Sequence, residues 1–359
     1  MPKYEIHPKI EHAETMPSSF YRSAEVFEEL IEKVFAKSWQ FIGDDGLVNQ
    51  DGAVYPFKFE GTEEPMLLSR DKETVRVLSN VCTHRGNILC HQPNKARNIT
   101  CAYHGRRFGL DGKFQHMPQF KEAKNFPRSA DDLHEFPMLK WGPWLFASMG
   151  QGYDFQDVIA AMERKIGFMP LNEFKLDVQR GKDYHIKAHW ALYCDNYLEG
   201  FHIPFVHADL NAALDYGNYE TVLFKYTNLQ IGYADGDEHV FDFPEGHEDF
   251  GKSIAAYYFW VFPNMMFNFY PWGLSINVVK PISKEQTKVS FISYVYDESK
   301  VDVGAGTNLD KVEQEDEEVV EGVQQGMKSK VYHTGRYSPE MEKGVHHFHR
   351  LLVEFLNEE

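Results

Sequence analysis

Two short segments near the start of the chain combine cysteine and histidine at close spacing. The first reads C-x-H at Cys82 and His84, and 16 residues later the second reads C-x-x-H at Cys101 and His104. Two thiolates and two neutral imidazoles can hold a [2Fe–2S] cluster, with the cysteines on one iron and the histidines on the other. A tetrahedral zinc site is the alternative, but no C-x-x-C pair occurs in the chain. We therefore expect a cluster that accepts and donates electrons.

A glycine follows or lies near each candidate histidine, at Gly86 and Gly105. Because glycine has no side chain, we expect these positions to let backbone N–H groups approach the cluster sulfurs closely. Electrons held by such a cluster need a destination, so a second metal site is expected elsewhere in the chain.

A candidate for that site lies near the middle of the sequence. Asn196, Glu199 and His202 recur every three residues, so a helix would place them on one face. Pro204 disfavours helical geometry in the residue before it. We therefore expect the helix to end near His202 and the chain to bring His207 back toward the same point. An H-x4-H pair alone is more typical of core or surface histidines, but downstream of an electron-carrying motif it indicates a metal site.

An iron held by two histidines still needs a carboxylate, and this set keeps coordination positions open for O2. At about 100° per residue, a helix over 312–327 has one apolar stripe, formed by Val312, Val319, Val320, Val323 and Met327. Asp316 lies near the middle of the stripe and Glu313 at its edge. The acids that point away are Glu315, Glu317, Glu318 and Glu321. A carboxylate on a buried stripe is costly unless it is paired or binds a metal, so we predict Asp316 as the third ligand. A merely solvated acidic helix is the alternative.

These motifs resemble those of Rieske non-heme iron oxygenase α subunits. The segment Cys101-Ala102-Tyr103-His104-Gly105-Arg106 is similar to the C-P-Y-H-G-W box of that family, from which Ala102 and Arg106 depart. Respiratory Rieske proteins add a disulfide at two positions that are Asn87 and Tyr103 here, so the chain resembles the oxygenase type. The run Glu313-Gln314-Glu315-Asp316 is similar to the box that carries the family's last iron ligand.

The resemblance assigns roles to the candidate residues. It implies a Rieske [2Fe–2S] cluster held by Cys82, His84, Cys101 and His104, and a mononuclear Fe(II) held by His202, His207 and Asp316. Glu199 and Asn196 are the expected catalytic residues. Glu199 would link His202 to a cluster histidine of a neighbouring subunit, which implies a homotrimer.

The resemblance also implies the terminal oxygenase component of a multicomponent system. Electrons from NAD(P)H would arrive through a separate flavin or ferredoxin-type reductase, because no G-x-G-x-x-G follows an expected strand in this chain. Glutamate at position 199 resembles the carnitine, choline and glycine-betaine oxygenase branch. Hydroxylation or demethylation of a small substrate, a quaternary ammonium compound, is therefore the leading expectation. The alternatives are an aromatic-ring-hydroxylating dioxygenase or O-demethylase, and a soluble Rieske electron carrier with an inert second domain.

Composition narrows the partners and the compartment. The net charge of −17 disfavours nucleic acid and anionic membranes as partners and suits a positively charged redox partner. We expect no signal peptide, and the sequence contains no apolar run long enough to span a bilayer. We expect the two remaining cysteines, Cys90 and Cys194, to be buried thiols, and the protein to be cytoplasmic.

The chain of 359 residues is long enough for two domains. We predict an α+β protein with a helical segment at 1–38 that packs on the catalytic domain. A β-sandwich Rieske domain is expected at 39–150, and a catalytic domain with an antiparallel sheet flanked by helices at 151–359.

Local patterns within these domains predict particular elements. Ser23 is expected to cap a helix over 24–37, and the residues 183–190 are expected to form a strand. The acidic stretch 235–249 is expected to be a solvated loop. Three histidines near the end of the chain fit packing or subunit contacts better than a metal cluster: His346, His347 and His349.

Overall fold

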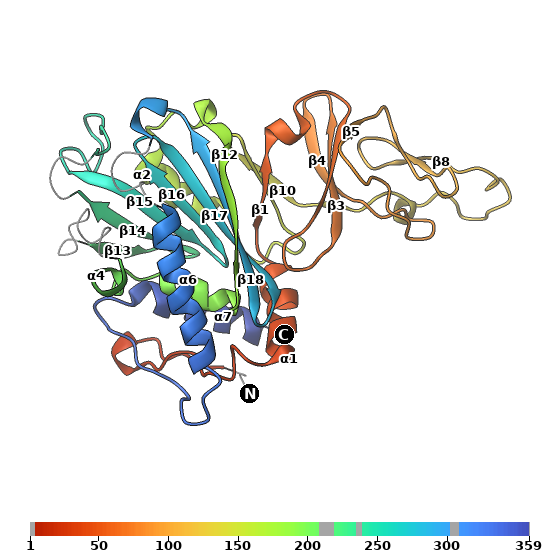
Figure 1. The fold of residues 1–359 in the computed structure, drawn as a ribbon. Coiled ribbons are helices and arrows are strands. Elements are labelled where there is room, and N and C mark those ends of the chain that lie inside the picture. The colour runs from red at the N-terminus through yellow and green to blue at the C-terminus, as the bar shows by residue number, and fades with distance from the viewer. Residues whose placement is uncertain (1–3, 208–218, 235–238, 302–308, 359) are drawn as a thin grey trace. The chain divides into compact units, whose positions relative to one another are not determined.

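The computed structural model describes residues 4–207, 219–234, 239–301 and 309–358. The chain divides into two compact units (Figure 1). The larger unit is formed by Met1–Val34 together with Asp154–Glu359, and the smaller unit by Phe35–Tyr153. Both combine antiparallel sheets with helical segments, which confirms the α+β class.

The smaller unit consists of short antiparallel strands. Its three sheets have the orders β5-β2-β3-β4-β9, β1-β11-β10 and β6-β7-β8. The strands are β1 (Gln40–Asp44), β2 (Ala53–Lys58), β3 (Pro65–Asp71), β4 (Thr74–Ser79), β5 (Asn94–Lys95), β6 (Ile99–Thr100), β7 (Arg107–Phe108), β8 (Phe114–His116), β9 (Glu135–Phe136), β10 (Met138–Trp141) and β11 (Trp144–Ala147). Two 3₁₀ turns accompany them, η3 (Asp45–Val48) and η4 (Ser129–Asp131).

Strand β3 separates two apolar cores in this unit. Successive side chains of a strand point to opposite faces, so Leu67 enters one core while Met66 and Leu68 enter the other. The core around Leu67 also contains Cys82 and Cys101. The cysteines of both motifs are therefore anchored in the hydrophobic interior of the smaller unit.

The larger unit is built on one seven-stranded sheet with the order β12-β18-β17-β16-β15-β14-β13. All neighbouring strands in it are antiparallel. The strands are β12 (Lys175–Ile186), β13 (Glu220–Leu223), β14 (Thr227–Tyr233), β15 (Ile254–Val261), β16 (Met265–Tyr270), β17 (Gly273–Ser283) and β18 (Gln286–Val295). Every residue of the central strand β16 is buried, so both faces of the sheet are covered there.

Helices of the larger unit pack on this sheet and on one another. They are α1 (Ala24–Leu30), the π-helical turn η2 (Ile31–Phe35), α2 (Gln156–Ile166), α3 (Trp190–Tyr197), α4 (Ile203–Val206), α6 (Leu309–Gly326) and α7 (Lys343–Asn357). Short 3₁₀ turns are η1 (Ile10–His12), η5 (Leu171–Glu173) and η7 (Glu298–Lys300). Helix α3 contacts β17, α6 contacts α3 and β12, and α7 contacts β13 (Figure 1). The segments that carry the second motif and the acidic helix are therefore direct neighbours.

The beginnings of α1 and α3 are both capped by side chains. The hydroxyl of Ser23 accepts a hydrogen bond from the N–H of Val26 at 3.2 Å, which confirms Ser23 as the cap of α1. The strand expected at 183–190 is wrong at its end, because β12 stops at Ile186. His189 instead caps α3, its Nδ1 accepting from the N–H of Ala191 at 3.2 Å. Burial lowers the pKa of His189 to about 3, so its ring is neutral and free to accept this bond.

The acidic stretch 235–249 is only partly a solvated loop. Its residues 235–238 lie outside the described part of the chain, but Asp249 is fully buried, contrary to the expectation. The carboxylate of Asp249 lies 2.6 Å from Nζ of Lys165 and also accepts from the hydroxyl of Tyr257 at 2.6 Å. This buried ion pair ties the end of the loop to α2 and to the sheet.

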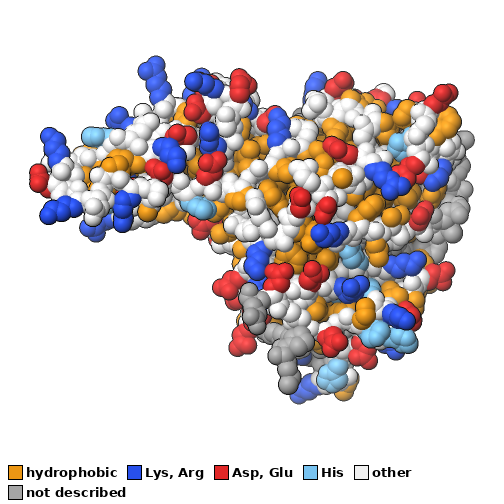
Figure 2. Space-filling view, turned by 180° about the vertical axis from the view of Figure 1, so that it is seen from behind, with side chains coloured by type: hydrophobic (Ala, Val, Ile, Leu, Met, Phe, Trp, Pro, Cys, Tyr) orange, Lys and Arg blue, Asp and Glu red, His pale blue; other side chains and the backbone are white. Residues whose placement is uncertain are grey.

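The two cysteines outside the motifs and the three late histidines lie apart from the candidate metal sites and have structural contacts. Cys90 and Cys194 are buried free thiols, as expected. The three late histidines bond separately, to carbonyl oxygens or to other side chains: His346 to His7, His347 to Lys225, and His349 to Tyr337 and Asp195. Lys and Arg side chains lie among the acids on the face drawn in Figure 2, although the net charge is −17. Among the helices in the described part of the chain, none is long and apolar enough to cross a membrane.

Candidate metal centres

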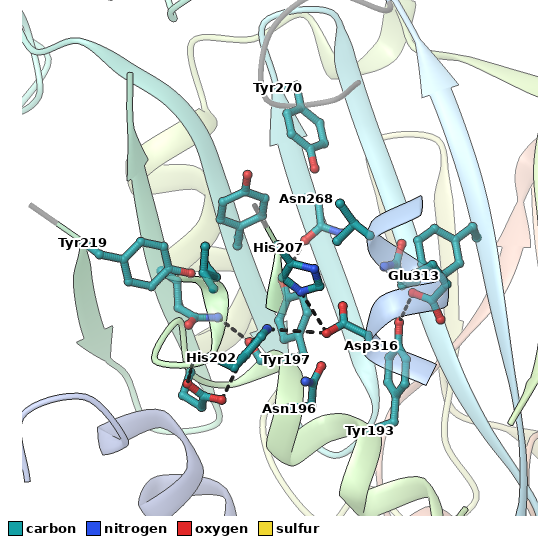
Figure 3. Close-up of a pocket in the computed structure, with 17 residues that line it drawn as sticks. Tyr193, Asn196, Tyr197, His202, His207, Tyr219, Asn268, Tyr270, Glu313 and Asp316 are labelled. Carbon is teal, nitrogen blue, oxygen red and sulfur yellow. Dashed lines mark hydrogen bonds and ion pairs between the residues drawn. The ribbon is translucent and has the colours of Figure 1, made fainter. Parts of the chain in front are cut away.

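The second motif lies on a turn rather than along a helix (Figure 3). Helix α3 ends at Tyr197, so the expectation of a helix reaching His202 is wrong, and only Asn196 of the three equally spaced residues belongs to it. The carboxylate of Glu199 accepts hydrogen bonds from the backbone N–H groups of Phe201 and His202. Such local side-chain bonds compete with helical ones and favour a turn.

Pro204 lies in the first turn of the next helix, which begins at Ile203, so it does not prevent helical geometry there. It occupies the first turn of α4, where a missing backbone N–H removes no helical hydrogen bond. The turn of α4 carries the chain from His202 to His207, and the ring centroids of these two histidines lie 5.1 Å apart. The two histidines therefore converge as expected, but through a helical turn that contains Pro204 and not through the end of a helix at His202.

Both imidazoles point one nitrogen at the same carboxylate oxygen. Nε2 of His207 lies 3.0 Å from Oδ1 of Asp316, and Nε2 of His202 lies 3.4 Å from the same atom. One ligand atom from each residue falls within 4.8 Å of the others. Asp316 is thus the acid of α6 that the structure places beside the two histidines, where the helical pattern put it.

The other nitrogen of each ring is held by a second carboxylate. Nδ1 of His202 lies 2.7 Å from Oε1 of Glu199, and Nδ1 of His207 lies 2.8 Å from Oε2 of Glu315. The expectation that Glu315 points away is therefore wrong, because the turn at α4 brings His207 to that flank of α6. Carboxylates in this position fix the ring orientation of a ligating histidine and raise its basicity.

The carboxylates of Glu199, Glu315 and Asp316 favour positive charge at this centre. Burial lowers the pKa of His202, but hydrogen bonds to Asp316 and Glu199 outweigh burial and raise it to about 9. The pKa of His207 is raised in the same way, with Asp316 and Glu315 opposing burial. Burial raises the pKa of Asp316, yet bonds from the two histidines lower it overall. A divalent cation would supply the positive charge that this arrangement favours.

The centre opens onto a cavity of about 130 Å³, as bounded by the described residues (Figure 3). Asn196 lines this cavity from the last turn of α3, together with Asn268 of β16. Tyrosine rings form much of the remaining wall, from Tyr193, Tyr197, Tyr219, Tyr258 and Tyr270. A cavity of this size suits a small molecule, since pockets for drug-sized ligands measure roughly 300–1,000 Å³.

Glu313 lines this cavity and is more deeply buried than the helical pattern predicts. The helical pattern puts Glu313 at the edge of the apolar stripe, but the exposed fraction of this residue is only 3%. Val319 and Val323, which belong to the stripe, are 36% and 39% exposed. Oε2 of Glu313 accepts from the hydroxyl of Tyr193 at 2.7 Å. Burial raises the pKa of Glu313 to about 8.

The two cysteine–histidine loops of the smaller unit share one backbone plan. The N–H of Gly86 donates to the carbonyl of Cys82, and that of Gly105 to the carbonyl of Cys101, each at 3.0 Å. Both glycines have positive φ angles, 69° and 72°, which residues with side chains rarely adopt. The structure therefore explains these glycines by the turn of each loop, and their N–H groups bond to carbonyls rather than point at the cysteine sulfurs.

The loops bring the four predicted cluster ligands to one end of the smaller unit. The ring centroids of His84 and His104 lie 4.8 Å apart. Cys82 and Cys101 are buried behind them, while His104 is exposed. Nδ2 of Asn87, at one of the positions where respiratory Rieske proteins have cysteine, donates to Sγ of Cys101 at 3.7 Å.

Arg106, which departs from the usual box, forms a buried ion pair. Its Nη2 donates to the carboxylate of Asp131 at 2.8 Å and to the carbonyl of the same residue at 3.0 Å. That carbonyl also accepts from the hydroxyl of Thr83 at 2.8 Å. Asp131 therefore ties the two ligand loops together. Three rings surround the guanidinium: Phe108, Phe114 and Phe126.

Both donor sets fit the groups that the motifs imply. Two buried thiols and two imidazoles on facing loops match the mixed ligation of a Rieske cluster. Two imidazoles and one carboxylate, open toward a cavity, match a non-heme iron that must leave room for O2. One chain that holds an electron-transfer centre and an oxygen-activating centre has the composition of a Rieske-type oxygenase.

Comparison with known proteins agrees with this class. Residues 38–127 match the family described as Rieske [2Fe-2S] domain, and residues 175–358 match the ring hydroxylating alpha subunit (catalytic domain). Choline monooxygenase of Arabidopsis thaliana is 30% identical over 97% of this chain and 85% of its own length. The carnitine monooxygenase oxygenase subunit of Escherichia coli K12 is 28% identical over 96% of this chain and 94% of its own length. A quaternary ammonium Rieske monooxygenase of known structure shares the fold, with a TM-score of 0.79, 24% identity, and coverage of 99% of this chain and 100% of that one.

The chain belongs to the ring hydroxylating alpha subunit family. It is a Rieske-type oxygenase, an oxidoreductase whose cofactors are a Rieske [2Fe–2S] cluster and a mononuclear iron.

Removing the Asp316 carboxylate is expected to empty only the mononuclear centre. Two imidazoles without a carboxylate hold Fe(II) weakly, so Asp316→Ala should contain about two irons per chain instead of about three, and should keep the visible spectrum of the cluster. Metal analysis and electron paramagnetic resonance measure both quantities. Glu318→Ala, which removes an exposed acid of the same helix, should keep all the iron. Full iron content in Asp316→Ala would show that another acid is the ligand.

Replacing Glu315 tests the second carboxylate brace. Glu315→Gln keeps a hydrogen-bond acceptor at Nδ1 of His207 but removes the negative charge that makes the ring more basic. We expect the affinity for Fe(II) to fall about tenfold, measured by competition with a chelator, while Glu318→Gln leaves it unchanged. Equal affinities in the two variants would mean that the contact between Glu315 and His207 has no part in metal binding.

Proposed function

We propose that this chain is the terminal oxygenase of a multicomponent system and that it hydroxylates a quaternary ammonium compound. The observation that carries the proposal is the convergence of His202, His207 and Asp316 at the wall of a small cavity lined by tyrosines. Monooxygenation of a carbon next to the ammonium nitrogen is the proposed reaction. The names of the related choline and carnitine monooxygenases support this substrate class.

The cavity wall supports a cationic substrate. The faces of tyrosine rings attract ammonium groups, and the attraction increases when the cation is desolvated. Amide side chains of Asn196, Gln230, Asn268 and Asn277 add polar atoms to the same wall. This mixture suits a small polar cation better than the flat hydrocarbon face of an aromatic substrate, so aromatic-ring dioxygenation is the weaker candidate. A second metal centre that opens onto a cavity also argues against a simple electron carrier.

The residues of each centre have distinct proposed roles. Cys82, His84, Cys101 and His104 hold the cluster, and His202, His207 and Asp316 hold the mononuclear iron. When bound, the cluster supplies single electrons and the iron supplies the site of O2 reduction. Glu199 and Glu315 orient the two imidazoles, and the tyrosine wall positions the substrate cation beside them.

We also propose that electrons pass between subunits of a homotrimer through Glu199. A second cavity, of about 210 Å³ as bounded by the described residues, is also lined by Glu199 and His202. Apolar residues of α6 line it, including Val319 and Val323, which are 36% and 39% exposed. Exposed apolar side chains beside a metal ligand suit a docking partner. Tyr103, 61% exposed at the tip of a cluster loop, is a fitting apolar contact from a neighbouring copy.

A separate NAD(P)H-dependent reductase and a cytoplasmic location complete the proposal. The reductase, of flavin or ferredoxin type, would reduce the cluster where His104 is exposed. The two cysteines outside the cluster motifs, Cys90 and Cys194, are free thiols, which is typical of proteins in reducing compartments.

Turnover of a quaternary ammonium compound tests the substrate class. Purified holoenzyme, supplied with a compatible reductase, NADH and O2, should oxidise choline or L-carnitine with one O2 consumed per product, as measured by mass spectrometry and an oxygen electrode. An aromatic hydrocarbon such as naphthalene should give no product. Oxidation of naphthalene without oxidation of any ammonium compound would overturn the proposal.

Glu199→Gln tests the inter-subunit route. Gln accepts hydrogen bonds through only one of its two terminal atoms, so it should weaken the link between imidazoles of two subunits without emptying either centre. We expect full iron content, normal reduction of the cluster, and single-turnover product formation slower by about 100-fold. Glu342→Gln is the control, because Glu342 lines the same cavity but bonds to the N–H of Ser338. A fully active monomer, or unchanged rates in Glu199→Gln, would contradict this route.

A further inference from the structure

Positive charge is concentrated in the part of the smaller unit that carries the cluster loops. The stretch 85–128 contains nine lysines and arginines but only two acids, Asp111 and Glu122, although the whole chain has 54 acids and 37 lysines and arginines. Most of these basic side chains are exposed: Arg85, Lys95, Arg97, Arg107, Lys113, Lys121, Lys124 and Arg128. Lys and Arg side chains gather toward the end of the smaller unit that lies at the left of Figure 2. A strongly acidic chain thus carries a basic surface around its cluster ligands.

The loop 117–128 connects this basic surface to a cluster ligand. The ring of Phe120 packs edge-on against His84, with 5.4 Å between the ring centroids. Phe126 lies 5.0 Å from Phe120 and faces the guanidinium of Arg106, whose central carbon is 5.4 Å from the Phe126 ring centroid. Two aromatic rings therefore hold the loop against the cluster end of the unit.

Several of the positive charges on this surface have no acidic partner. The exposed basic side chains without an ion pair among the described residues are Arg85, Arg97, Arg107, Lys121 and Lys124. Unpaired charges of one sign produce a field that extends about 8 Å into a solution of physiological ionic strength. Such a field attracts an oppositely charged surface and speeds its association. The basic surface is thus suited to recruit an acidic partner.

These charges lie where electrons have to enter the chain. The sequence contains no G-x-G-x-x-G motif for a nicotinamide or flavin nucleotide, so another protein has to supply the electrons. Tyr103, proposed above as a contact of a neighbouring copy, packs on His104 with 3.7 Å between the ring centroids. The basic loop packs on His84 instead. A donor on the loop and a neighbouring subunit at Tyr103 would therefore approach different cluster histidines.

We infer that the loop 117–128, together with Arg85 and Arg107, is the docking surface for the electron-donating protein, and that this partner presents an acidic face. The inference rests on the proposed function, which requires a separate reductase, and adds the charge of its contact surface. In each encounter one electron leaves the reduced donor and enters the cluster, and no bond forms or breaks. The net charge of −17 favours a positively charged partner instead, because a sum over the chain ignores where the charges lie.

The effect of salt on cluster reduction tests this inference without any variant. The probe is a reduced plant-type ferredoxin of strongly negative net charge, whose potential is low enough to reduce a Rieske cluster. Reduction of the holoenzyme is followed anaerobically, without substrate, by the visible absorption of the cluster in a stopped-flow instrument. The second-order rate constant should fall at least about tenfold between about 20 mM and about 300 mM salt, because salt screens the attraction.

Two results of this experiment would overturn the inference. One is a rate constant that rises with salt, as repulsion between two acidic proteins predicts. The other is a cluster that dithionite reduces and the ferredoxin does not. Either result leaves the proposed substrate class standing, because the choline assay tests that class separately. Conversely, failure of both choline and L-carnitine as substrates would leave the docking surface standing, since cluster reduction is measured without substrate.

Neutralising the loop tests where the docking surface lies. A Lys121→Gln/Lys124→Gln variant should lower the rate constant at low salt by about tenfold and weaken its dependence on salt. The control is Lys58→Gln/Lys72→Gln, which changes the net charge equally at exposed positions at the end of β2 and just after β3. This control should react at the wild-type rate.

Iron content, the cluster spectrum and the gel-filtration volume establish that both variants are intact. An unchanged rate of reduction in the intact Lys121→Gln/Lys124→Gln variant would overturn the placement of the docking surface. An altered oligomeric state with an unchanged rate would do the same, because it would assign the loop to a contact between copies of this chain.

An anionic membrane is the other kind of surface that exposed lysines and arginines attract. At about 150 mM salt, the holoenzyme should stay in the supernatant when phosphatidylserine vesicles are sedimented. Co-sedimentation that the Lys121→Gln/Lys124→Gln variant abolishes would overturn the choice of a protein as the partner of this surface.

Discussion

One carboxylate oxygen shared by two imidazoles is the interaction on which the candidate iron centre of the larger unit depends. Oδ1 of Asp316 lies within 3.4 Å of Nε2 of both His202 and His207, although His207 is 109 residues away along the chain. Bringing these atoms together requires α6 to pack against α3 and β12, and requires a turn instead of a helix after Tyr197. Glu199 and Glu315 then fix the two rings from behind.

The candidate ligands of the two centres are held in position in a similar way. In the smaller unit the cysteines are buried in an apolar core, and Asp131 bonds to Thr83 and Arg106 from the two loops. In the larger unit the ligands lie on a turn and on a helix that are held by a sheet whose central strand is buried on both faces. Most of the candidate ligands lie on short irregular segments, Asp316 of α6 being the exception, and regular elements with their hydrogen bonds restrict the movement of these segments. This arrangement suits metal centres because ligand directions must be held closely.

The sequence predicted most of the architecture and the candidate ligands, but not their surroundings. Cysteine and histidine spacing is local, so the two loops and the H-x4-H pair were visible without a structure, and helical angles were enough to select Asp316. The helix end at Tyr197, the contact of Glu315 with His207 and the burial of Glu313 all depend on packing between α3, α4 and α6. Periodicity within one helix cannot show which flank a neighbouring turn will cover. Asp249 illustrates the same limit, because its partner Lys165 comes from a distant helix.

The central claim is that His202, His207 and Asp316 surround one iron. Anomalous diffraction at the iron edge, measured on crystals of the holoenzyme, tests it most directly because it locates iron without reference to activity. The account predicts one isolated peak within coordination distance, about 2.0–2.2 Å, of Nε2 of both histidines and of the Asp316 carboxylate. It also predicts a pair of close peaks between the loops that carry Cys82 and Cys101. An isolated iron peak bound elsewhere, or zinc in place of the paired peaks, would contradict the account.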